Sequence, residues 1–156
     1  MSKLEQNILP GVGLGKLTLG TSEEEVLALM GEPSNKGDID YGDGVTIHMW
    51  EFEDDEISIT FAEDDEFRLG SITTGLDTAT LMGLPIIAQS EEEMLKCKFG
   101  DLGTPELEED AGDSGKDYCW DEANLSCWVA DDHVISVSIM PLYDESGDIP
   151  VWPTRS

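Results

Sequence analysis

Apolar residues alternate with polar ones in several short segments of the chain. Three such segments lie in the first half: "VTIHMWEF" (45–52), "EISITFA" (56–62) and "FRLGSITT" (67–74). Three more lie in the second half: "KDYCW" (116–120), "LSCWVA" (125–130) and "VISVSIM" (134–140). Alternation with a period of two, in segments rich in β-branched and aromatic residues, predicts strands that bury one face. We therefore expect two groups of antiparallel strands separated by acidic turns.

Two other segments have the spacing of a helix, and each begins with the sequence "SEEE". Ser22 with Glu25, and Ser90 with Glu93, fit the S-x-x-E capping box that satisfies free amides at a helix start. Apolar residues three to four positions apart then predict one buried face. The expected buried positions are Val26, Leu29 and Met30 in the first helix and Met94, Leu95 and Phe99 in the second.

The two helix starts are part of a longer internal similarity. Ser22 and Ser90 are 68 residues apart (90 − 22), and so are Ile57 and Leu125 (125 − 57). The last strands, in "DDEFRLGSI" (64–72) and "DDHVISVSI" (131–139), align at an offset of 67 (131 − 64). We interpret the chain as one domain made of two tandem copies and a tail. The copies are residues 10–75 and 76–143, and the tail is residues 144–156.

The charge of the chain limits the class of partner. Thirty-five Asp and Glu residues oppose eight Lys and Arg residues, so the net charge is −27 over 156 residues. A field of this sign repels nucleic acid and anionic lipid and attracts basic surfaces. We expect no direct nucleic-acid or membrane partner. Two other interpretations of the acidity are charged turns that keep the protein soluble and, less favoured, a high-salt habitat.

The sequence contains no recognisable secretory signal, and its cysteines do not suggest a set of disulfide bonds. Its first residues, "MSKLEQNILPGVGLGKL", lack the apolar core of a secretory signal, so a cytoplasmic protein is expected. Three cysteines, Cys97, Cys119 and Cys127, are expected to be free thiols. Since Cys119 and Cys127 fall on neighbouring predicted strands, a disulfide or a soft metal between them is the alternative.

Motifs that would indicate catalysis are incomplete. His48 and His133 lie at non-equivalent places of the two copies, and no serine lies in a G-x-S-x-G motif. "GVGLG" (11–15) lacks the dinucleotide-binding spacing, and we interpret it as a flexible lead-in. "DIDYGDG" (38–44) does not have the residues of a calcium loop, with Gly42 at its fifth position. We expect no enzyme activity, no cofactor and no bound metal.

The first helix carries a resemblance to a known superfamily. In "GTSEEEVLALMGEP" (20–33), the matching positions are Gly20, Thr21, Glu25, Val26, Met30, Gly31 and Pro33. The segment resembles one found in the BamE (SmpA/OmlA) and beta-lactamase-inhibitory-protein-like superfamily. The resemblance implies an α+β fold with two tandem copies of a helix-loop-helix plus a three- or four-stranded antiparallel sheet. These would form one continuous concave sheet with helices on the other face.

The acidic turns and one tryptophan are the candidate binding residues. Leu125, Cys127 and Val129 alternate onto a predicted core face, so Trp128 points to the opposite face. There it either anchors an interface or packs beneath the tail against Trp152. The acidic candidates are Asp54, Asp55, Glu56, Glu63, Asp64, Asp65, Asp121, Glu122, Asp131 and Asp132.

Small size, acidity and the implied binding platform favour a stoichiometric inhibitor. The leading hypothesis is an immunity protein, or antitoxin, of bacterial competition that occludes the active site or surface of a cognate toxin. A basic nuclease-type effector is the expected toxin, because an acidic platform can occupy the path of a phosphate backbone. The alternatives are a BamE-like scaffold or adaptor subunit of a protein assembly and, third, a module that binds a small molecule.

Overall fold

The structure is a computed structural model of the chain, and it describes residues 6–40, 42, 44–97, 99, 102–147 and 150–152. Part of the predicted C-terminal tail, residues 148, 149 and 153–156, lies outside the described residues. Tyr41 and Asp43, two residues of the rejected calcium loop, lie outside them as well.

The largest element is an eight-stranded antiparallel sheet with the order β10-β11-β12-β13-β7-β6-β5-β4. Its strands along the chain are β4 (Asn35–Asp40), β5 (Thr46–Phe52), β6 (Ile57–Ala62), β7 (Arg68–Thr74), β10 (Glu106–Asp110), β11 (Lys116–Trp120), β12 (Leu125–Ala130) and β13 (His133–Ile139). The six strands predicted from alternation are confirmed as β5, β6, β7, β11, β12 and β13. The sequence did not predict the edge strands β4 and β10.

A second, smaller sheet is built from very short strands. Its order is β3-β2-β1-β8-β9, and β1 and β8 are parallel. The strands are β1 (Asn7–Leu9), β2 (Gly13–Leu14), β3 (Leu17–Thr18), β8 (Thr80–Leu81) and β9 (Leu84–Pro85). The interpretation of residues 11–15 as a flexible lead-in was therefore wrong, since they form part of this sheet and bury Leu14 completely.

The predicted α+β fold with a helix-loop-helix in each copy was wrong. The described residues contain two α-helices, α1 (Glu23–Met30) and α2 (Glu91–Lys96), and the molecule is mostly β. The stretch before α1 cannot form another helix because its glycines hold positive φ angles. Gly13 has φ +154°, and a Cβ atom there would lie 2.0 Å from the carbonyl oxygen of Leu17. This geometry selects a tight hairpin that only glycine permits.

The two helices confirm the predicted starts and correct one buried face. Ser90 and Glu93 form the complete capping box, whereas in α1 the Ser22 hydroxyl accepts the amide of Glu25 without the reciprocal bond. Met94 and Phe99 are fully buried as expected, and so is Val26. Leu29 was expected to be buried but is exposed, and Leu27 packs against the core instead.

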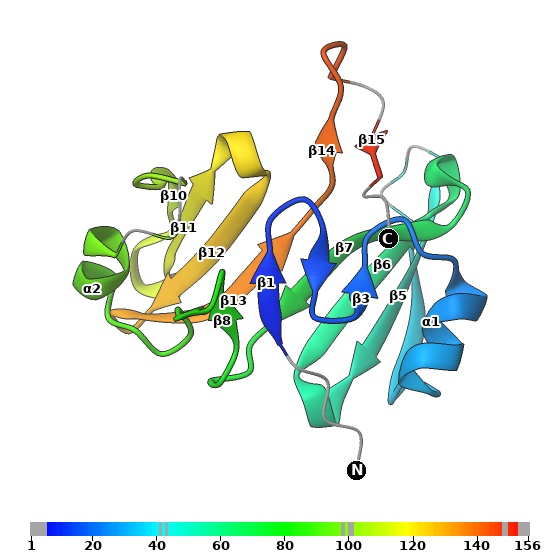
Figure 1. Cartoon of the computed structure of the whole chain (residues 1–156), viewed down its shortest axis with the longest axis horizontal. Coiled ribbons are helices and arrows are strands. Elements are labelled where there is room, and N and C mark those ends of the chain that lie inside the picture. The colour runs from blue at the N-terminus through cyan, green and yellow to red at the C-terminus, as the bar shows by residue number, and fades with distance from the viewer. Residues whose placement is uncertain are drawn as a thin grey trace.

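Both helices and the small sheet lie on the same side of the large sheet (Figure 1). On that side the large sheet contributes the alternate residues Ile57, Ile59 and Phe61 of β6 and Leu125, Cys127 and Val129 of β12, all of them buried. They form one core cluster with residues from the small sheet and both helices. We call the opposite side of the large sheet the open face.

The two halves of the large sheet, β4–β7 and β10–β13, meet where β7 pairs with β13. The offset of 67 predicted for the last strands was wrong. Arg68 pairs with Ala62 and His133 with Ala130, so these positions are 65 apart (133 − 68). The reason is a shorter turn, with two residues (131–132) in the second half against five (63–67) in the first. That the halves are tandem copies remains our interpretation.

The C-terminal segment folds back over the small sheet. Strands β14 (Leu142–Tyr143) and β15 (Pro150–Val151) form a hairpin that projects from the body in Figure 1. Leu142 packs close to Gly11, and the ring of Trp152 packs close to Gly20. Neither of the described helices has the length and the apolar composition needed to cross a lipid bilayer.

Candidate protein-binding face

The open face has a floor of short hydroxyl side chains. The strand registers align one row of side chains across all eight strands. The row is Glu106, Cys119, Ser126, Ser138, Thr73, Ser58, Glu51 and Asn35. At the junction of the halves, Thr73 and Ser138 are joined by a 2.9 Å hydrogen bond, and Thr60 is bonded to Ser71 in the next row. Such short side chains let another protein surface approach the sheet closely.

Trp128 lies on this face, as its alternation with Cys127 and Val129 predicted. It is half-buried and stands between Asp117 and Ser136 in the strand register. Gly115 packs against the ring, so closely that a Cβ atom there would lie 2.8 Å from it. The alternative partner, Trp152, packs instead near Gly20 on the covered side. The turn before β11 therefore holds the tryptophan, and Trp152, in the described part of the tail, packs elsewhere.

Carboxylates flank the hydroxyl floor on both halves of the open face. Glu51, Glu53 and Glu56 line a shallow hollow of about 370 Å³ together with Ser58 and Thr73. In the other half, Asp117 is half-buried beside Trp128, and burial followed by the nearby charge of Glu109 raises its pKa. A half-buried carboxylate whose charge is disfavoured gains from a cationic partner.

The structure divides the predicted acidic residues between the two ends of the large sheet. The turn with Asp54, Asp55 and Glu56 is η1 (Glu53–Asp55), and it lies at the same end as Asp131 and Asp132. The turns η2 (Glu63–Asp65) and η4 (Asp121–Ala123) lie at the opposite end and carry Glu63, Asp64, Asp65, Asp121 and Glu122. The candidates thus form two acidic borders and not one patch.

Within these borders, two carboxyls differ from the others. Asp55 and Asp65 are half-buried, whereas the remaining predicted acidic residues are exposed. Burial raises the pKa of Asp55, with a smaller contribution from Asp54, and burial and Asp64 do the same for Asp65.

The sequence analysis missed the acidic residues that lie within strands. Glu51, Glu106 and Asp117 contribute directly to the open face, whereas the predicted candidates come from turns. The hydroxyl floor was missed as well, although its signal is visible in the alternation of "ISIT" (57–60) and "ISVSI" (135–139). The polar positions of each strand were assigned to solvent, whereas in the folded sheet they build one surface together.

The two histidines make local contacts, and Cys119 and Cys127 are not joined to each other. Nδ1 of His48 lies 2.9 Å from Oε2 of Glu23, and its ring stacks on Phe67. The ring of His133 contacts the carbonyl oxygen of Asp131. Cys119 and Cys127 are free thiols on opposite faces of the sheet, so the disulfide alternative was wrong.

One group of side chains has the composition of a metal site. The potential ligand atoms of Glu108, Cys119 and Asp121 lie within 4.8 Å of one another. Burial, followed by Asp121 and Glu108, raises the pKa of Cys119 to about 12. The thiol is therefore protonated at neutral pH, and the thiolate form that binds metals is disfavoured. Exposed carboxylates of this kind are common in an acidic protein, and this group carries no metal assignment.

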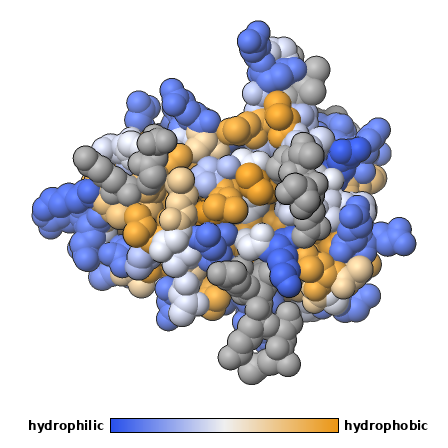
Figure 2. All heavy atoms as spheres, viewed as in Figure 1, coloured by the Kyte–Doolittle hydropathy of each residue, from blue (hydrophilic) through white to orange (hydrophobic). Residues whose placement is uncertain are grey.

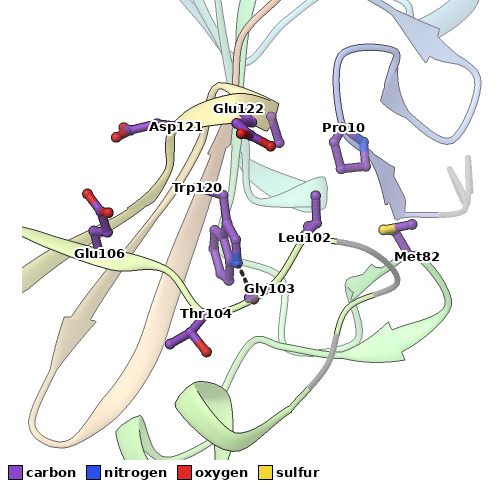
Figure 3. Close-up of a pocket in the computed structure, with 10 residues that line it drawn as sticks. Pro10, Met82, Leu102, Gly103, Thr104, Glu106, Trp120, Asp121 and Glu122 are labelled. Carbon is purple, nitrogen blue, oxygen red and sulfur yellow. Dashed lines mark hydrogen bonds between the residues drawn. The ribbon is translucent and has the colours of Figure 1, made fainter.

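A separate cavity of about 620 Å³ lies between the small sheet and η4. In Figure 3, Leu102, Met82 and Pro10 lie on one side of Trp120, and Glu106 and Asp121 lie on the other. The Trp120 ring is fixed because its Nε1–H donates to the carbonyl of Gly103 at 3.1 Å. Figure 2 shows that apolar side chains gather over the small sheet, where Leu9, Val12 and Met82 are exposed.

Comparison of the chain with protein-family models, with curated proteins and with solved structures found no match.

Proposed function

We propose that the protein is a stoichiometric inhibitor, namely a cytoplasmic immunity protein that binds a basic toxin through the open face of its large sheet. The observation that carries this proposal is the chemistry of that face. Hydroxyl side chains form its floor, half-buried Trp128 lies beside them, and carboxylates flank both halves. Surfaces that contain an aromatic side chain and carry complementary charge are typical of protein interfaces.

The distribution of cations supports an acidic binding face. The eight strands of the large sheet contain three Lys and Arg residues, Lys36, Arg68 and Lys116. Lys36 lies over the Trp50 ring and Lys116 contacts Glu91, so both belong to the covered side. Arg68 begins the central strand β7 and lies at the η2 end of the open face, where it is 3.9 Å from Glu66. The open face therefore keeps its negative potential, which speeds encounter with a basic partner.

A nuclease-type toxin fits this chemistry best. Its substrate path must be basic to hold phosphates, and an acidic sheet can occupy that path without being cleaved. The adaptor role of a BamE-like subunit is the second candidate. It differs in one observable respect, because an adaptor binds its partner without blocking an activity.

The test begins with the genes that flank this one, and any effector domain encoded there is purified with and without the present protein. We expect a one-to-one complex that suppresses the effector's activity, with an association rate that falls steeply as salt rises. Replacing Trp128 by alanine should raise the dissociation rate by roughly thirtyfold, equivalent to about 2 kcal/mol, whereas Leu29→Ala, which shortens an exposed side chain on α1 away from the open face, should have little effect. Binding without suppression of activity would favour the adaptor role.

A charge-reversal pair separates the open face from the overall charge. Glu51→Lys with Asp117→Lys changes the open face, and Glu24→Lys with Asp77→Lys changes exposed positions elsewhere by the same amount. Only the first pair should slow association strongly if the open face docks. Equal effects of the two pairs, in variants with unchanged melting temperature, would show that the face does not bind the partner.

A further inference from the structure

The small sheet carries an exposed apolar surface that the open-face proposal does not use. Its exposed side chains are Leu9 (41%), Val12 (39%), Met82 (40%) and Leu84 (40%). Met82 lies beside β1, because its backbone amide donates to the carbonyl of Ile8, the residue before Leu9. We call these four residues the neutral patch, and Figure 2 shows apolar side chains gathering over the small sheet.

The neutral patch differs from the rest of the chain in its charge. Asp and Glu make up 35 of the 156 residues, whereas residues 6–21 and 78–89, which contain all five strands of the small sheet, contain neither. Solubility alone would favour charged side chains at exposed positions of this kind. The exclusion of carboxylates from an exposed apolar surface therefore indicates a contact with another molecule.

The turn between β8 and β9 is an independent sign of such a contact. Leu81 pairs with Leu84, so Met82 and Gly83 form a two-residue turn, and their φ angles are +51° and +84°. Turns with positive φ at both positions favour Asn-Gly, because most other side chains are strained there. Local stability thus favours asparagine at position 82, whereas contact with an apolar surface favours methionine.

We infer that the neutral patch binds the neutral patch of a second copy of this chain and forms a two-fold dimer. Two copies that each carry a net charge of −27 repel each other wherever their carboxylates meet, and a surface without acidic residues minimises that repulsion. A basic partner, in contrast, gains from carboxylates in its docking surface. A two-fold contact also requires a self-complementary surface, and apolar side chains against apolar side chains meet this requirement.

The dimer leaves the open face of each copy accessible. The small sheet and the open face lie on opposite sides of the large sheet (Figure 1), so the two open faces point away from each other. Each dimer can therefore bind two partner molecules. The inference does not rest on the proposed inhibitor function, because the neutral patch and the open face share no residue.

The direct test is analytical ultracentrifugation of the intact protein, from about 1 to about 300 µM, at low and at high salt. We expect a monomer–dimer equilibrium in which the dimer is favoured as salt rises, since salt screens the repulsion between the two copies. This salt dependence is opposite to the one expected for association with a basic toxin. A monomer at every concentration in high salt would overturn the inference, and so would a dimer that salt dissociates.

Two matched variants assign the dimer to the neutral patch. Leu9→Glu places a carboxylate in the contact of both copies, and it should weaken dimerisation by roughly a hundredfold. Leu29→Glu adds the same charge at an exposed leucine of α1, and it should weaken dimerisation less than about threefold. Equal effects of the two variants, each with the melting temperature of the wild type, would show that the copies meet elsewhere.

Met82→Asn separates contact from folding. It should weaken dimerisation by roughly tenfold, because it removes apolar surface from the contact of each copy. In dilute, monomeric samples it should raise the melting temperature, because asparagine suits the positive φ at this position. Unchanged dimerisation by Met82→Asn would contradict the inference. Trp128→Ala, which changes the open face, should leave the dimer as it is, and loss of the dimer in this variant would assign the contact to the open face.

Discussion

The two helices contact the large sheet through glutamates at equivalent positions but with different partners. In the first half, Glu23 of α1 contacts His48 of β5. In the second half, Glu91 of α2 accepts hydrogen bonds from Lys116 and Tyr118 of β11. The glutamates are 68 residues apart (91 − 23), and so are His48 and Lys116 (116 − 48). One position in the fold therefore carries an imidazole in one half and an ammonium group in the other.

This difference in partner changes how strongly each glutamate holds its helix to the large sheet. An imidazole is charged only when protonated, whereas Lys116 is charged at all physiological pH values, and Glu91 raises its pKa further. Glu91 also accepts the Tyr118 hydroxyl, and this bond, followed by Lys116, lowers the pKa of Glu91. We expect the second half to hold its helix more firmly at neutral pH.

The largest expected effect comes from neutralising the two glutamates separately, which measures how much each stabilises the fold. Glu91→Gln removes the charge that accepts two hydrogen bonds, and it should lower the free energy of unfolding by about 2 kcal/mol at pH 7. Glu23→Gln should lower it by about 0.5 kcal/mol, because Glu23 contacts one partner, the ring of His48, whereas Glu91 accepts hydrogen bonds from two. Urea unfolding of both variants measures the difference. Equal losses would show that the partner's charge does not matter.

The pH dependence gives a second measurement on the same pair. Since the folded pKa of Glu91 lies below its ordinary value of 4.5, its contribution is fully present above pH 4.5. It is lost as the pH falls through the lower folded pKa. The stability difference between the wild type and Glu91→Gln should therefore be constant from pH 7 to about pH 5 and then shrink. A difference that grows on acidification would contradict the assignment.

A smaller effect is expected just before each helix, where the two halves use different residues for one backbone shape. Gly20 has φ +87° and lies against Trp152, whereas Ala88, 68 residues later (88 − 20), has φ +69°. Gly20→Ala should lower the free energy of unfolding by about 1–2 kcal/mol through left-handed strain and contact with the ring. Ala88→Gly should raise it by up to about 1 kcal/mol. Thermal unfolding tests both, and destabilisation by Ala88→Gly would refute the strain argument.

The parts of the fold that the sequence predicted are those whose pattern depends on one buried face. Strands β6 and β12 alternate strictly, and their buried residues are the predicted ones. The edge strands β4 and β10 have no such pattern, because most of their residues are exposed on both faces. The small sheet has strands of two or three residues, and contacts between distant segments hold it, for example Asn7 with Thr80. No local pattern encodes that pairing.

The candidate site was predictable to a similar extent. The direction of Trp128 followed from its neighbours along one strand, and the structure places it on the open face. The row from Glu106 to Asn35 depends on the register of eight strands, which alternation within one strand does not determine. The cavity beside Trp120 depends on the docking of the small sheet, and the sequence carries no direct signal for it.

Each half of the large sheet also contains a half-buried carboxylate whose ionisation should destabilise the fold. Burial raises the pKa of Asp65 in the first half and of Asp117 in the second. A raised folded pKa means that ionisation destabilises the fold, fully so above that pKa, and that stability returns as the pH falls through it. Asp65→Asn and Asp117→Asn should each raise the free energy of unfolding at pH 7 by a few tenths, up to about 0.5 kcal/mol. Salt should reduce the gain, and a loss of stability would indicate an unrecognised cationic partner.

The smallest effect is expected from metal removal, and it concerns a position where the halves differ again. Cys119 occupies the row position that Glu51 occupies in the first half, since both pair with a serine of the next strand. With the pKa of Cys119 near 12, its thiol stays protonated, and the group with Glu108 and Asp121 offers no thiolate to an ion. Incubation with a chelator should shift the melting temperature by less than about 1 °C, and Cys119→Ser should respond identically. A larger shift in the wild type that Cys119→Ser abolishes would show that the thiol binds metal in spite of its raised pKa.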